Sequence, residues 1–106
     1  MIARQWHGWT TSENANAYES HVRTEIFPPI QRVNGYRGAY LLRRRAGDEV
    51  EFMALTLFDS LDAVRAFAGE NYQMAVISPI ARNLLSHFDE QAVHYDVAIE
   101  LRSVPN

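Results

Sequence analysis

The sequence predicts a single α+β domain over residues 1–106, in which four antiparallel strands form one sheet and helices cover only one of its faces. Three observations lead to this fold class. Strand-like and helix-like segments alternate in the order strand, helix, strand, strand, helix, strand. Right-handed crossovers place both main helices on the same side of the sheet. Several strands are apolar on both faces, so the face without helices requires a partner.

The first strand and the first helix occupy the N-terminal third of the chain. Ile2 to Trp9 is rich in bulky residues, and neither face of this segment is polar. Thr10-Thr11-Ser12-Glu13 matches a capping box, with the first threonine as N-cap and the glutamate reaching back to it. A helix is therefore expected from about Ser12 to Phe27, with a buried stripe at helical spacing formed by Ala15, Tyr18, Val22 and Ile26. Pro28-Pro29 is expected to end or bend it.

The next two strands are expected to form a hairpin. Tyr36 to Arg45 and Val50 to Asp59 flank a plausible turn at Gly47-Asp48. The second segment is apolar on both faces in its middle, which is unusual for a solvated antiparallel sheet in a monomer. A face of four strands buries about 800 Å² per partner in a standard interface. We therefore predict a homodimer whose two open sheet faces pack against each other.

The second half of the chain repeats the pattern less regularly. Asp59 or Ser60 is expected to cap a helix that runs through about Ala68, with Gly69 as its stop. Ser78-Pro79 predicts a third short helix that reaches about Phe88, because serine suits the N-cap and proline the first helical position. The last strand is expected from Ala92 to Arg102.

Composition excludes several classes of function. The net charge of −3 argues against a nucleic-acid partner, which usually selects a strongly basic face. The absence of cysteine excludes disulfides, thiolate nucleophiles and cysteine-ligated metals. No apolar run approaches the roughly 20 residues needed to cross a bilayer, so no membrane partner is expected. The chain enters a strand without a leader-like segment, and a cytoplasmic location is the default expectation.

A family resemblance follows from four stretches of sequence taken together. They are Ile2-Ala3-Arg4-Gln5-Trp6-His7-Gly8-Trp9-Thr10, Gly35-Tyr36-Arg37-Gly38, the stretch from Phe58 to Gly69, and Phe88-Asp89-Glu90 with His94-Tyr95-Asp96-Val97. In this order they resemble the antibiotic biosynthesis monooxygenase (ABM) domain family of the dimeric α+β barrel superfamily. The resemblance implies a ferredoxin-like βαββαβ domain that pairs through its sheet. The resemblance also implies an activity like those of the relatives, which oxidise aromatic phenols without metal or flavin, degrade haem or handle quinols.

The residues of the haem-degrading relatives are not matched here. Those relatives use an asparagine on the first strand and a tryptophan and a histidine on the second helical stretch. This chain has Gln5 and His7 on the strand, and Phe67 and Ile77 on the helical stretch. The polar set of the polyketide-oxidising relatives cannot be assigned residue by residue either.

One helix face offers a candidate base. Tyr18, His21 and Glu25 adjoin through i+3 and i+4 spacing. Glu25 could accept a hydrogen bond from His21 and orient it as a base. The alternative is a surface ion pair beside the buried stripe. The four histidines have no His-x-x-x-His spacing, so no metal site is predicted.

Aromatic residues supply the candidate pocket walls, and two further residues its mouth. Trp6, Tyr18 and Phe67 are the predicted walls, while Tyr72 and Arg82 flank the most irregular part of the chain. Core packing and ordinary surface contacts are the alternatives for these residues. Two functions stay open. One is a cofactor-independent monooxygenase that oxidises a small aromatic phenol or quinol, and the other is a non-catalytic dimer that binds a small hydrophobic molecule.

Overall fold

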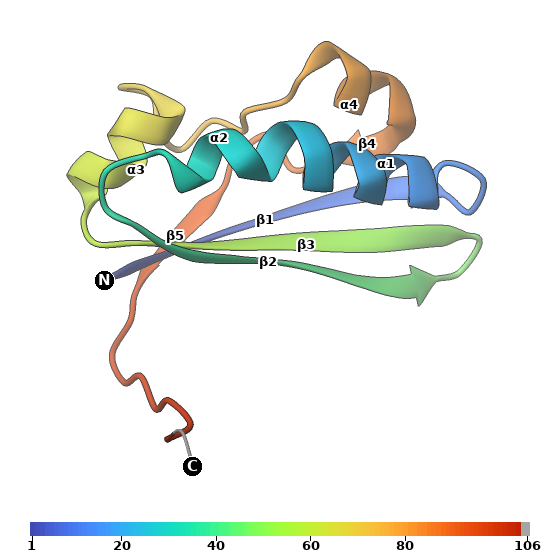
Figure 1. Ribbon diagram of the computed structural model, residues 1–106. Helices are drawn as coiled ribbons and strands as arrows, with labels where there is room; N and C mark the ends of the chain where they lie inside the picture. The colour runs from blue at the N-terminus through green and yellow to red at the C-terminus, as the bar shows by residue number, and fades with distance from the viewer. Residues whose placement is uncertain (105–106) are drawn as a thin grey trace.

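A computed structural model describes residues 1–104 and confirms an α+β fold with an open antiparallel sheet. Four of the five strands follow the order β2-β3-β1-β4 across the sheet. The fifth strand, β5, pairs with β1 as well. Figure 1 shows the helices gathered on one side of the sheet and the other side bare. The strands are β1 (Ile2–Thr11), β2 (Tyr36–Ala46), β3 (Glu49–Phe58), β4 (Leu85–Phe88) and β5 (Val93–Asp96).

The predicted fourth strand is split into two short pieces along the same edge of β1. β4 pairs with Gly8–Thr10, whereas β5 pairs with Ile2–Gln5. The third helix, α4 (Pro79–Leu84), therefore ends before the predicted Phe88, because residues 85–88 pair with β1 instead. Gly8 permits this pairing: a Cβ there would lie 2.6 Å from the Trp6 ring and 2.9 Å from the Leu85 side chain. The last strand also ends earlier than the predicted Arg102.

The first helical segment is longer than predicted and contains a wide turn. It runs through α1 (Ala15–His21), the π-helical turn η1 (Val22–Ile26) and α2 (Phe27–Gln31). Pro28-Pro29 was predicted to end or bend the helix after Phe27, but the helical segment continues through both prolines to Gln31. The prolines lie in the first turn of α2, where a missing N–H costs little. The Phe27 N–H bonds to the Val22 carbonyl across the wide turn.

The predicted capping box is also wrong. Thr10 is fully buried in β1 and pairs with Val50, so the strand continues where the helix cap was expected. Asn14 is the N-cap of α1 instead, and its backbone N–H donates to the Thr11 hydroxyl over 3.2 Å. Burial of this threonine in the sheet outweighs a cap worth about 1 kcal/mol.

The other local predictions are confirmed. The β2–β3 hairpin turns at Gly47, whose φ of 64° lies in the left-handed region. α3 (Leu61–Ala68) has Ser60 as its N-cap, and Gly69 follows with φ 87°. In α4, the Ser78 hydroxyl accepts from the Ala81 N–H over 3.1 Å. No helix within residues 1–104 is long and apolar enough to cross a membrane.

The two faces of the sheet differ in what covers them. The helix-covered face holds the core, in which Phe52, Phe58 and Val64 are fully buried. The open face exposes large side chains, namely Tyr40, Leu42, Val93 and Tyr95. Residues 97–104 form no helix or strand and extend away from the body (Figure 1). Three of their apolar side chains are almost wholly exposed: 89% for Ile99, 95% for Leu101 and 84% for Val104.

Candidate functional site

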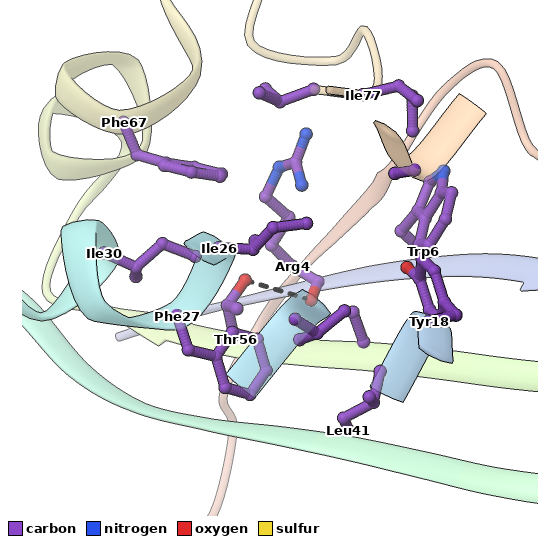
Figure 2. Close-up of a pocket in the computed structure, with 14 residues that line it drawn as sticks. Arg4, Trp6, Tyr18, Ile26, Phe27, Ile30, Leu41, Thr56, Phe67 and Ile77 are labelled. Carbon is purple, nitrogen blue, oxygen red and sulfur yellow. Dashed lines mark hydrogen bonds between the residues drawn. The ribbon is translucent and has the colours of Figure 1, made fainter. Parts of the chain in front are cut away.

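An apolar cavity of about 50 Å³ lies between the covered face of the sheet and the helices. β1 and β3 form its floor, the segment α1–α2 forms one wall, and residues of α3, α4 and the chain before α4 complete it (Figure 2). Three of the predicted wall residues meet there: Trp6, Tyr18 and Phe67. The wide turn η1 contributes Val22 and Ile26, so the irregular part of the helix borders the cavity.

An open groove of about 440 Å³ adjoins this cavity along the edge of β2. The two spaces share three lining residues, Val22, Phe27 and Leu41. Glu19 and Arg23 lie at the outer side of the groove and pair with each other over 2.9 Å. The cavity is thus separated from solvent on this side by the side chains of three apolar residues.

Arg4 is the charged residue of the cavity and was not among the predicted site residues. It is 7% exposed, and Figure 2 shows its side chain rising from β1 between Phe67 and Ile77. Its Nη2 donates to the Met74 carbonyl over 3.1 Å, while its buried Nε has no hydrogen-bond partner. Its guanidinium carbon lies 5.3 Å from the centre of the Phe67 ring. Burial lowers the pKa of Arg4 to about 10, so the group stays protonated at neutral pH.

The aromatic walls are fixed by their own contacts. Trp6 donates its indole N–H to the Asp89 carbonyl over 2.7 Å. Tyr18 packs edge-on against Phe52, with ring centres 4.8 Å apart. Burial raises the pKa of Tyr18, so its hydroxyl keeps its proton and can serve as a donor. These residues present flat apolar surface to the cavity in defined orientations.

His21 and Glu25 are not brought together by the fold. The His21 Nε2 shares a hydrogen bond of 2.8 Å with the Ser78 hydroxyl, which also caps α4. Glu25 is exposed, and no hydrogen bond or ion pair within residues 1–104 joins it to His21. His21 does not line the cavity, but its chain neighbour Val22 does, and so does Ile77 beside Ser78. His21 and Ser78 are thus chain neighbours of two residues that line the cavity.

Tyr72 and Arg82 lie apart from this cavity. Tyr72 packs edge-on against His94, with ring centres 5.1 Å apart, and carries the guanidinium of Arg65 over its ring. Arg82 is exposed on α4 and lies over the Phe88 ring. Neither residue lines the 50 Å³ cavity.

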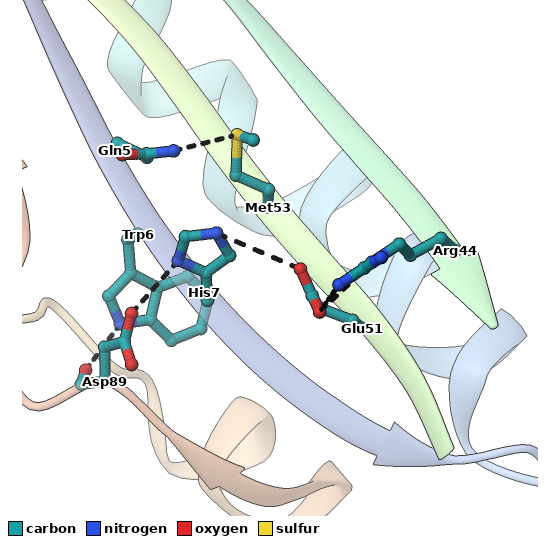
Figure 3. Close-up of polar contacts among 7 residues, drawn as sticks. All are labelled: Gln5, Trp6, His7, Arg44, Glu51, Met53 and Asp89. Carbon is teal, nitrogen blue, oxygen red and sulfur yellow. Dashed lines mark hydrogen bonds and ion pairs between the residues drawn. The ribbon is translucent and has the colours of Figure 1, made fainter. Parts of the chain in front are cut away.

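A polar cluster occupies the opposite, open face of the sheet. The His7 Nδ1 lies 3.1 Å from a carboxylate oxygen of Asp89, and its Nε2 lies 3.9 Å from Glu51 (Figure 3). Glu51 also accepts from Arg44 over 3.0 Å. Within residues 1–104 no group of three or more histidine or acidic side chains is arranged to hold a metal ion.

Strand alternation was the signal that could have identified Arg4. Ile2, Arg4, Trp6 and Gly8 occupy one face of β1, so the choice of Trp6 as a wall residue already placed Arg4 beside it. Thr56 lines the cavity on β3 for the same reason, opposite Arg4 in the register. The contribution of the Met74 carbonyl has no comparable signal, because residues 69–78 lack a periodic pattern.

Several solved structures are similar to this fold. A variant of MhuD with two manganese protoporphyrin IX molecules bound per active site has a TM-score of 0.71 and 15% identity, and covers 97% of this chain and 100% of its own. The haem-degrader MhuD from Mycobacterium tuberculosis, with two haems bound, has a TM-score of 0.62 and 15% identity over 96% and 100% of the two chains. A proposed antibiotic biosynthesis monooxygenase from Bacillus cereus has a TM-score of 0.68 and 11% identity over 96% and 97%.

No protein-family model and no curated protein sequence matches the chain. The likeness to the solved structures is one of fold, at identities of 11–16%. It supports the resemblance first drawn from the sequence. The chain has the ferredoxin-like fold of the antibiotic biosynthesis monooxygenase proteins.

Proposed function

We propose that the chain binds a small aromatic phenol or quinol in the cavity and its adjoining groove, and oxidises it with molecular oxygen without a cofactor. The observation that carries this proposal is the apolar cavity with walls formed by Trp6, Tyr18 and Phe67. Flat apolar walls favour a planar aromatic ligand and exclude water from it. The proposed activity of the similar Bacillus cereus protein belongs to the same reaction class.

The reaction needs no external reductant when the substrate is an anthrone-type phenol. Loss of a proton gives an electron-rich anion, which can pass an electron to oxygen. One oxygen atom then replaces the two hydrogens of a ring CH₂ carbon as a carbonyl. The other oxygen atom leaves as water with those two hydrogens. The substrate loses four electrons in total, and these reduce one molecule of oxygen.

His21 is the proposed base, and its support is that its chain neighbour Val22 lines the cavity while the Ser78 hydroxyl holds the imidazole in one orientation. Glu25 was proposed to orient His21, but Ser78 makes the contact that this role requires. We therefore propose Glu25 only as a charge near His21 on the same helical segment.

The rival function is a dimer that binds a small hydrophobic molecule without turnover. One observation favours it: the 14 residues that line the cavity include no histidine, aspartate or glutamate. Haem, the ligand of MhuD, fits less well. No imidazole lines the cavity to ligate its iron, and about 50 Å³ is far below the volume of a porphyrin ligand.

Oxygen uptake separates the two functions. Purified protein is mixed with an anthrone and quinol panel in the presence of a chelator, and uptake is recorded beside Trp fluorescence. Uptake that depends on the protein supports the enzyme, whereas fluorescence quenching without uptake supports the binding protein. His21→Ala tests the base. His21→Gln is its matched control for structure, because an amide can still bond to Ser78 but cannot accept the substrate proton. Unchanged uptake in both variants excludes His21.

We also propose that two copies of the chain pair through their open sheet faces. The exposed apolar residues of this face support the proposal, since monomers rarely leave a large contiguous apolar patch in water. The helix-covered face, which holds the cavity, stays accessible in such a pair.

A further inference from the structure

We propose that Arg4 binds the anionic oxygen of an aromatic ligand, so that the cavity selects aryl carboxylates or ionised phenols over neutral aromatic molecules of the same shape. This inference rests on the proposed function only in using the same cavity. It adds the chemical class of the ligand, and it holds for an enzyme and for a binding protein alike.

The first argument is that Arg4 is buried without a counter-ion. It is 7% exposed, and no aspartate or glutamate within residues 1–104 forms an ion pair with it. An isolated buried charge raises the free energy of the folded state unless another charge offsets its desolvation. Its contacts are a neutral carbonyl and an aromatic ring, from Met74 and Phe67. Neither neutralises the charge.

The second argument is that Arg4 has donors to spare. A guanidinium carries five N–H donors in a planar fork that matches two oxygens of one anion. Met74 takes a bond from Nη2, and the buried Nε has no partner. The nearby Thr56 hydroxyl donates to the Arg4 backbone carbonyl over 3.5 Å and is directed to the backbone rather than the guanidinium. An oxyanion in the cavity would satisfy the unpaired donor.

Another arginine of the chain shows what a purely structural role looks like. The Arg43 guanidinium carbon also lies 5.3 Å from an aromatic ring centre, that of Phe52, on the same face of the sheet. Arg43, however, bonds to Glu19 over 2.9 Å and to Asn16 over 3.1 Å. The two residues share a cation–π geometry and differ in burial and in the presence of a carboxylate. Compared with Arg43, Arg4 is a buried arginine without a carboxylate partner.

The surroundings of Arg4 fit an aromatic anion in particular. The cavity wall contains no carboxylate that would repel an anion, and its large residues are apolar or aromatic. The aromatic walls of the cavity suit the ring of a ligand whose anionic oxygen reaches Arg4, and a ligand larger than 50 Å³ would extend into the 440 Å³ groove once the shared side chains of Val22, Phe27 and Leu41 move. For a phenol, a positive charge at this position favours the ionised form. Arg4 would thereby promote the loss of the proton that the proposed oxidation requires.

The test compares two ligands of one shape and different charge, 2-naphthoate and 2-naphthamide. Binding is followed at neutral pH by quenching of Trp fluorescence and by calorimetry. The wild-type protein should bind the acid about 10- to 100-fold more tightly than the amide, the ratio expected for one charge-assisted hydrogen bond. Arg4→Met should remove this preference, so that the acid and the amide bind with similar affinity. Arg43→Met, the matched control, should keep the preference.

A third ligand distinguishes ionised phenols from carboxylates. Bound 2-naphthol should show the ultraviolet absorption of its phenolate in the wild-type protein and of the neutral phenol in Arg4→Met. Preference for the acid without phenolate formation would assign the site to carboxylates alone. Equal affinities of the wild-type protein for acid and amide would overturn the proposal, and this measurement does not depend on the folding of any variant. A preference for the acid without oxygen uptake would leave Arg4 as the anchor and exclude the proposed oxidation.

Discussion

The buried charge of Arg4 should destabilise the folded state, and a variant without this charge can measure the effect. Arg4→Met keeps the length of the side chain, removes the buried charge and gives up the hydrogen bond to Met74. We expect the free energy of unfolding to rise by about 1–3 kcal/mol, as in proteins where buried charges are replaced by apolar residues. Urea denaturation of both proteins measures the difference.

The control for this prediction is Arg43→Met, which removes an arginine with the same ring contact and two exposed polar partners. Because exposed ion pairs contribute little, this change should lower the free energy of unfolding by about 1 kcal/mol or less. A loss of stability in Arg4→Met that matches the control would contradict the unfavourable burial of Arg4.

His94 supplies a pH dependence whose direction follows from its surroundings. Burial and the charge of Arg4 lower the pKa of His94 below 6.5, and Tyr72 covers the ring from the helix side. The unfolded chain therefore binds more protons than the folded one as pH falls below about 6.5. Stability should be fully present above this pH and decrease toward the lowered pKa. His94→Gln should weaken the decrease in thermal melts at about pH 7.5 and 5.5.

The same histidine reports on Arg4. Arg4→Met removes the second cause of the shift, so the pKa of His94 should rise toward its usual value while burial keeps it below. Titration of the imidazole protons by NMR measures the pKa in both proteins. An unchanged pKa would show that the two side chains do not interact.

At the scale of the helices and strands, Ser78 joins the cap of α4 to His21. Its hydroxyl accepts from the Ala81 N–H over 3.1 Å and shares a bond of 2.8 Å with the imidazole. Ser60 caps α3 in the same way, accepting from Ala63 over 3.2 Å. Ser60→Ala should cost about 1 kcal/mol, the usual value of an N-cap. Ser78→Ala should cost about 1 kcal/mol more, because His21 also loses its partner.

Equal losses in the two serine variants, measured by urea denaturation, would show that the His21–Ser78 bond contributes nothing to stability. A larger loss for Ser78→Ala would establish that the bond holds the start of α4 against α1. It would also support the proposed orientation of His21.

The sequence predicted the β2–β3 hairpin and α3 because residues close together in the chain determine both. The β2–β3 hairpin and α3 follow from Gly47, Ser60 and Gly69, whose backbone and side-chain preferences act within a few residues. The elements that were wrong depend on distant partners. Leu85–Phe88 has the composition of a helix end but pairs with β1, and Thr10 is buried by Val50 across the sheet. Propensity yields to tertiary pairing in both cases.

The site was predictable to the extent that it depends on strand alternation and helical spacing. These periods brought Trp6, Tyr18 and Phe67 to one cavity. They could not show that His21 bonds to Ser78, which is 57 residues away in the chain, or that Tyr72 turns toward His94. Contacts made by irregular segments depend on the assembled fold and leave no periodic signal.

For the whole molecule, the open sheet face predicts a pair of chains. Light scattering of the wild-type protein at micromolar concentration should give twice the monomer mass of 12.2 kDa. Leu42→Glu places a charge on the open face at the edge strand β2 and should give the monomer mass, since an unpaired charge is not tolerated inside an interface.

The matched control for Leu42→Glu is Ile80→Glu, which changes an exposed apolar residue on α4, on the helix side of the molecule. It should leave the mass unchanged. A wild-type protein with the mass of a single chain would contradict the proposed pair, and so would an unaffected mass in Leu42→Glu.

Proteolysis of the C-terminal segment 97–104 should report whether two chains associate. Ile99, Leu101 and Val104 extend from the body with almost no cover, in a stretch that has no regular secondary structure. Proteases cleave such backbone readily when it is free. Chymotrypsin should therefore trim a solitary chain at Leu101 within the first minutes of digestion, while a partner that shelters the segment would delay the cut. The rate of trimming should then fall as the protein concentration rises, so a digestion series can reveal the pairing equilibrium without any label.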